Sequence, residues 1–230
     1  MVAGRWPCPK RTFALSSPAP ARLTGGGPQA ISLRAIAHEM GMTAPAIYRY
    51  FPSLDALVIQ LTRDLFDEVR QTLETAREAA GDDPAQQLAE MARSFRQWSV
   101  AHPAEFALVF GAPVPGISTF DDDCAHTEHP AAAFGALFTQ ALLQLWRQAP
   151  WPTPPSEVLR ERLGDALQPL KQNQGDMPLE VAYTFLSGWV RLYGLISIEV
   201  NEHLGWAVTE PKALFEAEIR NLLQQLTAGR

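Results

Sequence analysis

The segment from Ser32 to Phe51 constrains the fold of this 230-residue chain more than any other stretch. Ser32 suits a helix N-cap, and Gly41 can adopt the left-handed conformation that ends a helix. Thr43 suits a second N-cap, and Pro45 is tolerated in the first turn of the helix that follows. Ahead of Gly41, apolar residues recur at the three-and-four spacing of a helix buried on one face: Leu33, Ile36, Ala37 and Met40. The pattern predicts two short helices joined by a tight turn.

Such a helix-turn-helix places its second helix in the major groove of double-stranded DNA. We call residues 43–51 the reading helix. Ile47 and Phe51 are expected to point toward the first helix. This leaves four side chains facing outward: Ala44, Tyr48, Arg49 and Tyr50. The alternative interpretation is an ordinary helical hairpin that binds no ligand.

The charge distribution favours the DNA-binding interpretation. Residues 1–50 carry six basic side chains and one acidic side chain, a net charge of +5. The remaining residues carry thirteen basic and twenty-four acidic side chains, a net charge of −11, which leaves −6 for the whole chain. A basic end beside an acidic body fits a protein that presents only that end to phosphates. Within the motif the basic side chains are Arg34 and Arg49.

Beyond Phe51 the sequence predicts one helix after another, with no strand alternation. We expect a long helix from Ser53 to the break at residues 81–84, a second from Leu88 to His102, and a short third through Phe106 and Phe110. Residues 111–130 are rich in Pro, Gly and Asp and are typical of a loop. Helices are expected to resume at residues 131–148, 156–171, 179–204 and 212–227. The fold class is therefore all-α.

The expected organisation is a small DNA-binding domain followed by a larger helical body. We assign residues 31–75 to the helix-turn-helix domain with its connecting helix, and residues 76–230 to an effector-binding and dimerisation domain. Residues 1–30 contain Pro18 and Pro20, which interrupt any regular helix. We expect these thirty residues to form an atypical, poorly ordered segment.

Residues 181–200 are apolar nearly all round, so this helix must be buried in protein or in a membrane. Arg191 in its middle, Glu199 near its end and the lack of a partner span argue against a membrane. Burial by a second copy of the chain fits better, with the closing helix completing a symmetric four-helix interface. The expected interface residues are Leu192, Ile196, Phe215, Ile219, Leu222, Leu223 and Leu226.

Aromatic residues in the body supply enough surface to line an apolar ligand pocket. The expected pocket residues are Trp98, His102, Phe106, Phe110, Phe138, Trp189 and Tyr193. Helical aromatics also pack as plain core, so that alternative stays open. Polar candidates nearby are His102, Arg191, Tyr193, Glu199 and His203, of which Glu199 and His203 stand four apart and could pair. We hypothesise a mostly apolar, neutral or weakly polar effector.

Residues 32–57, SLRAIAHEMGMTAPAIYRYFPSLDAL, resemble the DNA-binding segment of tetracycline-repressor-like (TetR) transcription regulators. The resemblance implies phosphate contacts from Thr43 and Tyr48, and places Ala44, Pro45 and Tyr50 at or near the base edges. The chain departs from the family at Leu54, where a lysine is usual. A phosphate contact is therefore expected to be missing, which flattens the salt dependence of binding by about one charge.

Two segments of the body, FRQWSVAHPAEFALVFGAPVPG at residues 95–116 and WVRLYGLISIEVNEHLG at residues 189–205, resemble the C-terminal domain called WHG in one TetR subgroup. Tyr193 stands where that subgroup usually has histidine. The resemblance implies a homodimeric repressor of a palindromic operator that is released from DNA when a small molecule enters the body.

Other functions find less support in the sequence. Residues 121–129, DDDCAHTEH, offer carboxylates, a thiol and imidazoles to a metal, but their spacing matches no structural zinc pattern. We expect no catalytic residues, metal site or cofactor. A further alternative is a ligand-binding helical dimer that has lost DNA binding, which Leu54 and the interrupted start favour. Two cysteines imply no disulfide framework, so a reducing cytoplasm is the expected compartment.

Overall fold

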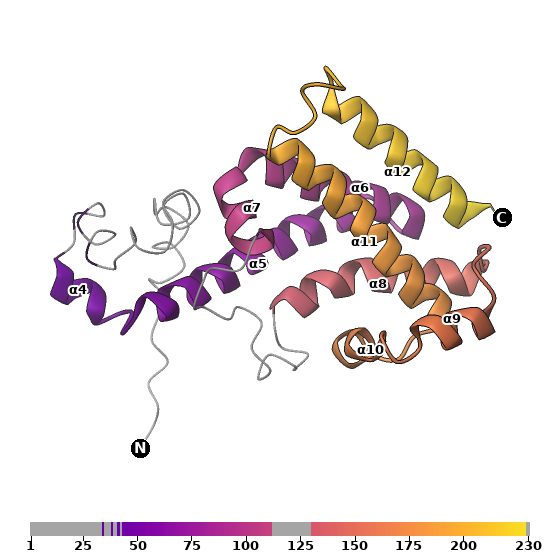
Figure 1. Ribbon diagram of the computed structural model, residues 1–230, viewed down its shortest axis with the longest axis horizontal. Helices are drawn as coiled ribbons and strands as arrows, with labels where there is room; N and C mark the ends of the chain where they lie inside the picture. Colours follow the sequence, from indigo (N-terminus) through magenta and orange to yellow (C-terminus); the bar gives the residue numbers. More distant parts are fainter. Residues whose placement is uncertain (1–33, 35–37, 39–40, 42, 112–129, 229–230) are drawn as a thin grey trace. The chain divides into compact units, whose positions relative to one another are not determined.

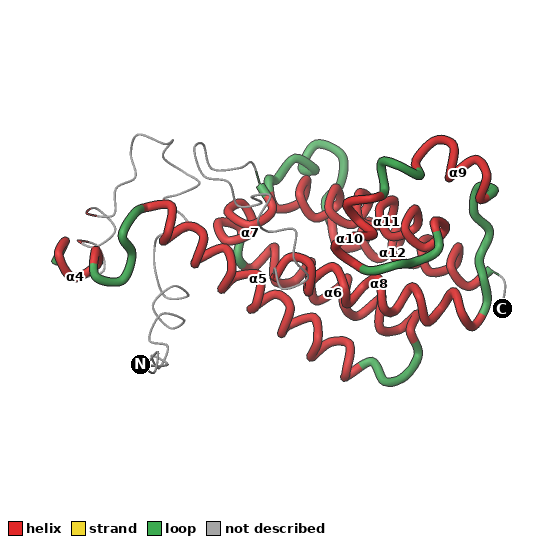
Figure 2. Tube along the Cα trace, turned by 90° about the horizontal axis from the view of Figure 1, so that it is seen from below, coloured by secondary structure: helices red, strands yellow, loops and turns green. Residues whose placement is uncertain are grey.

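The computed structural model describes Arg34, His38, Gly41, residues 43–111 and residues 130–228 (Figure 1). Throughout the described residues the regular elements are α-helices and no strand occurs (Figure 2), which confirms the all-α prediction. The helices are α4 (Ala44–Tyr48), α5 (Leu54–Ala79), α6 (Pro84–Ala101), α7 (Pro103–Phe110), α8 (Pro130–Gln148), α9 (Ser156–Leu163), α10 (Gln168–Gln174), α11 (Leu179–Val200) and α12 (Pro211–Thr227). The expected atypical segment 1–30 and the predicted N-cap at Ser32 lie outside the described residues.

The chain divides into two compact units. The first comprises Met1–Glu68 and Ala104–Asp121, and the second comprises Val69–Pro103 and Asp122–Arg230. One boundary between them therefore falls inside α5, a few residues before the domain limit at residue 75 expected from the sequence.

The first unit contains α4, the N-terminal part of α5 and nearly all of α7. Ser53 caps α5, since its Oγ accepts a hydrogen bond from the Ala56 amide at 3.1 Å. Most apolar side chains of α4, of the turn after it and of this part of α5 are buried, among them Ile47, Phe51, Leu57, Val58, Leu61 and Leu65. Phe66 packs edge-on against Phe110 with ring centroids 5.4 Å apart, which ties α7 to α5.

The second unit is built around α6, α8 and α11, which pack against one another (Figure 1). Helix α12 lies on α6 and α11, α9 lies on α11, and α10 lies on α8. Phe95 is at the centre, edge-on to Phe134 at 5.3 Å and stacked on Trp189 at 5.9 Å. Helix α6 begins at Pro84, about one turn before the Leu88 expected from the sequence, and the Asp83 carboxylate caps it by accepting the Ala85 amide at 3.1 Å.

Two predicted helices differ in extent from those observed. The helix expected at residues 156–171 is divided into α9 and α10, because Pro169 lacks an amide proton and its ring would clash within a continuing helix. The helix expected to reach Leu204 ends at Val200, where Asn201 Nδ2 donates to the Ser197 carbonyl at 2.7 Å. Glu202 then adopts a left-handed φ of 57°, which turns the chain.

Candidate functional site

The turn before α4 has the geometry that its sequence predicts. Gly41 has a φ of +66°, the left-handed conformation that glycine adopts without steric cost. Thr43 is the N-cap residue with extended backbone, and its carbonyl accepts the Ala46 amide at 2.9 Å. Its side chain makes no capping hydrogen bond, so the cap is weaker than the sequence suggests. Pro45 lies in the first turn, where its missing amide costs nothing.

Helix α4 and the three residues after it have a buried inner face and an exposed outer face. Ile47 and Phe51 are buried, whereas Tyr48 is 52% exposed and Tyr50 is 47% exposed. The remaining predicted contact residues whose side chains are described are also exposed: Arg34, Thr43, Pro45 and Arg49. Phenol hydroxyls and a guanidinium on an exposed helix can bond to phosphates and base edges. The outer face therefore has the chemistry that a reading helix needs.

Helix α5 begins at Leu54, whose side chain is half-buried, and its first turn carries Asp55. An acidic residue suits the positive end of the helix dipole but repels phosphate. No cation stands in this first turn. The lysine that the family usually carries here has no substitute among the first-turn residues.

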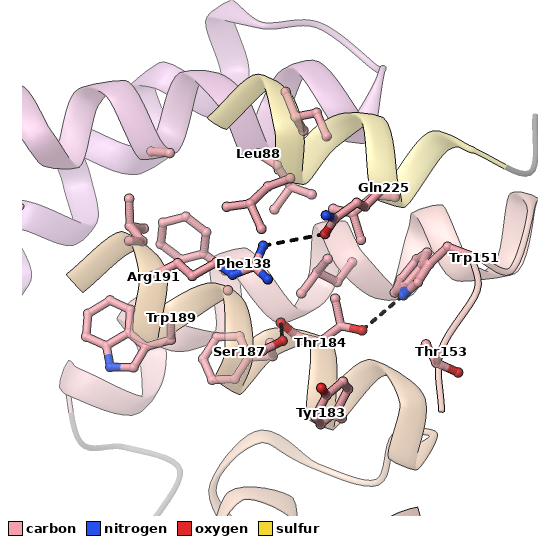
Figure 3. Close-up of a pocket in the computed structure, with 18 of the residues that line it drawn as sticks. Leu88, Phe138, Trp151, Thr153, Tyr183, Thr184, Ser187, Trp189, Arg191 and Gln225 are labelled. Atoms are coloured by element: carbon pink, nitrogen blue, oxygen red, sulfur yellow. Dashed lines mark hydrogen bonds between the residues drawn. The ribbon is translucent and has the colours of Figure 1, made fainter. Parts of the chain in front are cut away.

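The second unit has a partly open cavity of about 310 Å³ between α6, α8, α11 and α12 (Figure 3). Residues 151–154, between α8 and α9, complete its wall. The lining is predominantly apolar and includes Leu88, Ala92, Phe138, Leu142, Trp151, Phe185, Trp189, Leu192, Ile219, Leu222, Leu223 and Leu226. The polar lining residues include Thr153, Tyr183, Thr184, Ser187, Arg191 and Gln225. A largely apolar cavity with a few polar groups is the usual form of a small-molecule site.

Protein groups already engage several of the polar atoms around this cavity. Trp151 Nε1 donates to Thr184 Oγ1 at 3.0 Å, and that hydroxyl donates to the Glu180 carbonyl at 2.7 Å. Ser187 Oγ donates to the Thr184 carbonyl at 3.2 Å. Arg191 Nη1 lies 3.5 Å from Gln225 Oε1, at the outer limit of a hydrogen bond (Figure 3).

The predicted pocket residues lie in three different parts of the structure. Phe138 and Trp189 line the cavity. Tyr193 stacks on Trp189 at 5.8 Å without reaching the lining, and Trp98 packs against His102 at 5.4 Å, also outside it. Phe106 and Phe110 belong to the first unit, where they pack against each other at 5.4 Å.

Within one protomer, the residues predicted for a dimer interface lie around the cavity or in the core. The cavity is lined by Leu192, Ile219, Leu222, Leu223 and Leu226. Ile196 and Phe215 are buried in the core. Leu88, Trp151 and Tyr183 also line the cavity and were not predicted there. Leu88 carried a signal, its place on the apolar stripe of α6, whereas Trp151 lies between two prolines, where no periodicity exists.

Ion pairs fix the helices around this unit. Arg96 on α6 binds Glu199 on α11, with Nε donating to Oε2 at 2.8 Å, so Glu199 does not pair with His203 as its spacing suggested. Arg93 donates to both carboxylate oxygens of Glu216 on α12, at 2.9–3.1 Å. These hydrogen bonds lower the pKa of Glu216 below its ordinary value of 4.5, although burial opposes the shift. They also raise the pKa of Arg93.

The described residues bear on two further possibilities, a metal site and a membrane span. No group of three or more His, Cys, Asp or Glu side chains there could hold a metal ion, and the predicted alternative at residues 121–129 lies outside them. Helix α11 is long and apolar enough to cross a membrane by length and composition alone. Its contacts with α6, α8, α9 and α12 are those of a helix in a protein body.

A short helix with an exposed aromatic and basic face, in a segment whose sequence predicts a helix-turn-helix, and an all-helical body are features of a DNA-binding regulator. Residues 22–61 match the sequence profile described as bacterial regulatory proteins, tetR family. Residues 88–222 match the profile described as tetracyclin repressor-like, C-terminal domain. The chain belongs to the TetR family of transcriptional regulators.

Individual relatives agree with this assignment. The HTH-type transcriptional regulators Rv1816 of Mycobacterium tuberculosis and Mb1846 of Mycobacterium bovis are each 32% identical over 212 residues, which cover 89% of this chain and 87% of theirs. The crystal structure of SCO4313, described as a regulatory protein, is 30% identical, with a TM-score of 0.67 over 94% of this chain and 98% of that one. A Rhodococcus sp. RHA1 protein of unknown function shares the fold, with a TM-score of 0.64 at 18% identity and 93% coverage of both chains. The names of the mycobacterial relatives agree with a regulator of transcription.

Proposed function

We propose that the protein is a ligand-responsive repressor of the bacterial cytoplasm. It binds a palindromic operator as a homodimer, and a small, largely apolar molecule releases it from DNA by entering the cavity of the second unit. The observation that carries the proposal is that cavity, about 310 Å³ with mostly apolar walls, in a chain of the TetR family.

The proposed DNA contacts come from the exposed face of the reading helix and from Arg34 in the helix predicted before it. Thr43 and Tyr48 contact phosphates, and Arg34 and Arg49 add positive charge. Ala44, Pro45 and Tyr50 lie at or near the base edges. Ile47 and Phe51 are buried, whereas Tyr48 and Tyr50 are exposed. This exposure supports the proposed roles, since the two tyrosine side chains are not part of the buried core.

A mobility-shift assay on the DNA that flanks the protein's own gene tests DNA binding. Tyr48→Ala is expected to reduce affinity at least about tenfold, because it removes one phosphate contact and part of the docking surface. Trp206→Ala is the matched control, since Trp206 is an exposed aromatic side chain on the turn after α11. Equal affinities for the two variants, or no binding at low salt, would contradict the proposal.

The homodimer is supported by the uncovered surface of α11. Only 22% of its most apolar eighteen-residue window is buried within the protomer. Val190, Gly194 and Ile198 follow one another at four-residue spacing, with Val190 68% exposed and Ile198 38% exposed. A Cβ at Gly194 would meet no atom within 4 Å, so a second helix has room to approach. A second copy covers this stripe and the half-exposed leucines of α12 in the proposed dimer.

Light scattering during gel filtration tests the dimer. Val190→Asp is expected to shift the protein from dimer toward monomer, because it puts a charge into the proposed apolar interface. Val158→Asp on α9 is the control, since Val158 is also exposed and lies outside the stripe. A monomeric unmodified protein, or dimers in both variants, would overturn the proposed interface.

Leu54 favours a second candidate function, a ligand-binding dimer without useful DNA affinity. The half-buried Leu54 and the exposed Asp55 at the start of α5 offer nothing attractive to phosphate. This alternative predicts a dimer that binds small molecules normally and gives no shift with flanking DNA at any salt concentration.

A further inference from the structure

Arg191 gives the cavity of the second unit an unusual chemical character. It extends from α11 at the rim, and it is the only charged side chain among the described residues that line the cavity (Figure 3). Its described contact is the neutral amide oxygen of Gln225 at 3.5 Å. Arg93 and Arg96, by contrast, are held by the carboxylates of Glu216 and Glu199.

A guanidinium beside an apolar cavity favours one kind of ligand group. Its planar set of donors matches the two oxygens of a carboxylate, and such charge-assisted bonds are stronger than neutral ones. The hydroxyls of Thr184 and Ser187 donate to backbone carbonyls and have no second proton to offer. Arg191 is therefore the group best suited to hold an anionic head while the rest of a ligand lies on the apolar wall.

We propose that the cavity binds a small carboxylic acid with an apolar body, and that Arg191 binds its carboxylate. This inference rests on the proposed function of the cavity as the effector site, and it replaces a neutral effector by an amphiphilic anion. The cavity of about 310 Å³ is at the lower end of the range for small-molecule sites, so octanoate, a short acid with an unbranched apolar body, is a suitable probe.

The test compares three eight-carbon ligands that differ only at the head: octanoate, 1-octanol and octylamine. Tryptophan fluorescence reports binding, because Trp151 and Trp189 line the cavity, and calorimetry gives the affinities. Burial alone favours the alcohol, since removing a carboxylate from water costs more than removing a hydroxyl. We expect the reverse order, with octanoate about three- to fivefold tighter than octanol and octylamine weakest.

Arg191→Gln is expected to abolish the preference for the acid and to leave octanol affinity within about twofold, because the apolar wall is unchanged. Arg191→Lys should keep part of the preference, since it keeps the charge without the planar donors. Arg220→Gln on α12 is the matched control, because Arg220 is exposed and does not line the cavity. Circular dichroism and a thermal melt confirm that each variant is folded.

The inference is overturned if octanol binds as tightly as octanoate, if the preference survives in Arg191→Gln, or if millimolar octanoate does not bind. A parallel mobility shift separates this result from the proposed function. Octanoate that binds with the expected preference but leaves the protein on DNA contradicts release by the effector while the acid site stands. Release by octanol without any preference for the acid contradicts the acid site alone.

Discussion

At the residue scale, two arginines on one face of α6 form ion pairs with glutamates on neighbouring helices. Arg93 reaches α12 through Glu216, and Arg96 reaches α11 through Glu199. Arg96 also lies over the Phe215 ring at 5.4 Å, so its charge is placed between a carboxylate and an aromatic face. The side chains of Arg96 and Glu199 are only 16% and 11% exposed, which makes this pair costly to break on one side.

Glu199→Gln is the first prediction. We expect it to lower the free energy of unfolding by about 2 kcal/mol, because it leaves the Arg96 charge largely buried without its partner. Glu74→Gln is the control, since its pair with Arg70 within α5 is more exposed, at 34% and 26%, and should cost less than about 0.5 kcal/mol. Urea denaturation of both variants measures the difference. Equal losses would contradict a special role for the buried pair.

The pair of Arg93 and Glu216 predicts a dependence of stability on pH. The pKa of Glu216 is lower in the folded protein than its ordinary value of 4.5, because Arg93 bonds to the charged form. A lowered folded-state pKa stabilises the protein at pH values above the unfolded pKa, and this contribution disappears as pH falls through the folded pKa. Acid should therefore weaken the attachment of α12 to α6.

Glu216→Gln should flatten this response. Between about pH 5 and pH 3 the free energy of unfolding of the unmodified protein is expected to fall more steeply than that of the variant. Glu218→Gln, two positions further along α12, changes the same group without touching Arg93 and should keep the steep fall. Urea denaturation at several pH values measures the slopes. Parallel curves for all three proteins would show that the pair contributes no pH dependence.

At the scale of elements, α10 is attached to α8 largely through Gln174. Its Nε2 donates to the Ala132 carbonyl at 3.0 Å, and its Oε1 accepts from Thr139 Oγ1 at 3.3 Å. Gln174→Ala is expected to cost about 1 kcal/mol and to speed amide exchange in α10. Gln168→Ala, at the exposed start of the same helix, should do neither. Hydrogen exchange followed by mass spectrometry distinguishes the two variants, and unchanged exchange in Gln174→Ala would contradict this docking role.

The helices were largely predictable because their signals are local. Gly41, Ser53 and the break before Pro84 act on their own backbone, and each has the expected effect. Pro169 also acts locally, and giving it full weight would have divided the helix expected at residues 156–171 correctly. No such signal predicted the early end of α11. Glutamate rarely adopts a left-handed conformation, so Glu202 gave no sign of the turn that it makes here.

The sequence predicted an apolar ligand cavity but not most of the residues that line it. Periodicity identifies which face of α12 is apolar, but it cannot say whether that face covers a cavity or a second protein copy. Leu222 and Leu226 were expected at an interface, and in the protomer they line the cavity. Trp151 reaches the cavity through its bond to Thr184, a contact thirty-three residues distant that no local pattern contains. Tertiary packing decides such positions.

At the scale of the whole molecule, the N-terminal fifty residues and the rest of the chain carry net charges of opposite sign. Residues 1–50 carry a net charge of +5 and the rest a net charge of −11. The acidic part is repelled by DNA, so binding depends on few cations and each added one has a measurable effect. The start of α5 is the place to add a cation, because the family usually carries a lysine where this chain has Leu54.

Leu54→Lys is therefore expected to raise affinity for flanking DNA and to steepen its salt dependence. Each new phosphate contact changes the slope of log affinity against log salt by about −0.9. A homodimer adds two contacts, so the slope should steepen by about 1.8, whereas a monomer on DNA would give about 0.9. Gln71→Lys, exposed further along α5, adds the same charge away from the reading helix and should change the slope little. Fluorescence anisotropy across salt concentrations measures all three proteins. An unchanged slope in Leu54→Lys would show that this end of α5 does not face phosphate, and a change near 0.9 would contradict binding as a dimer.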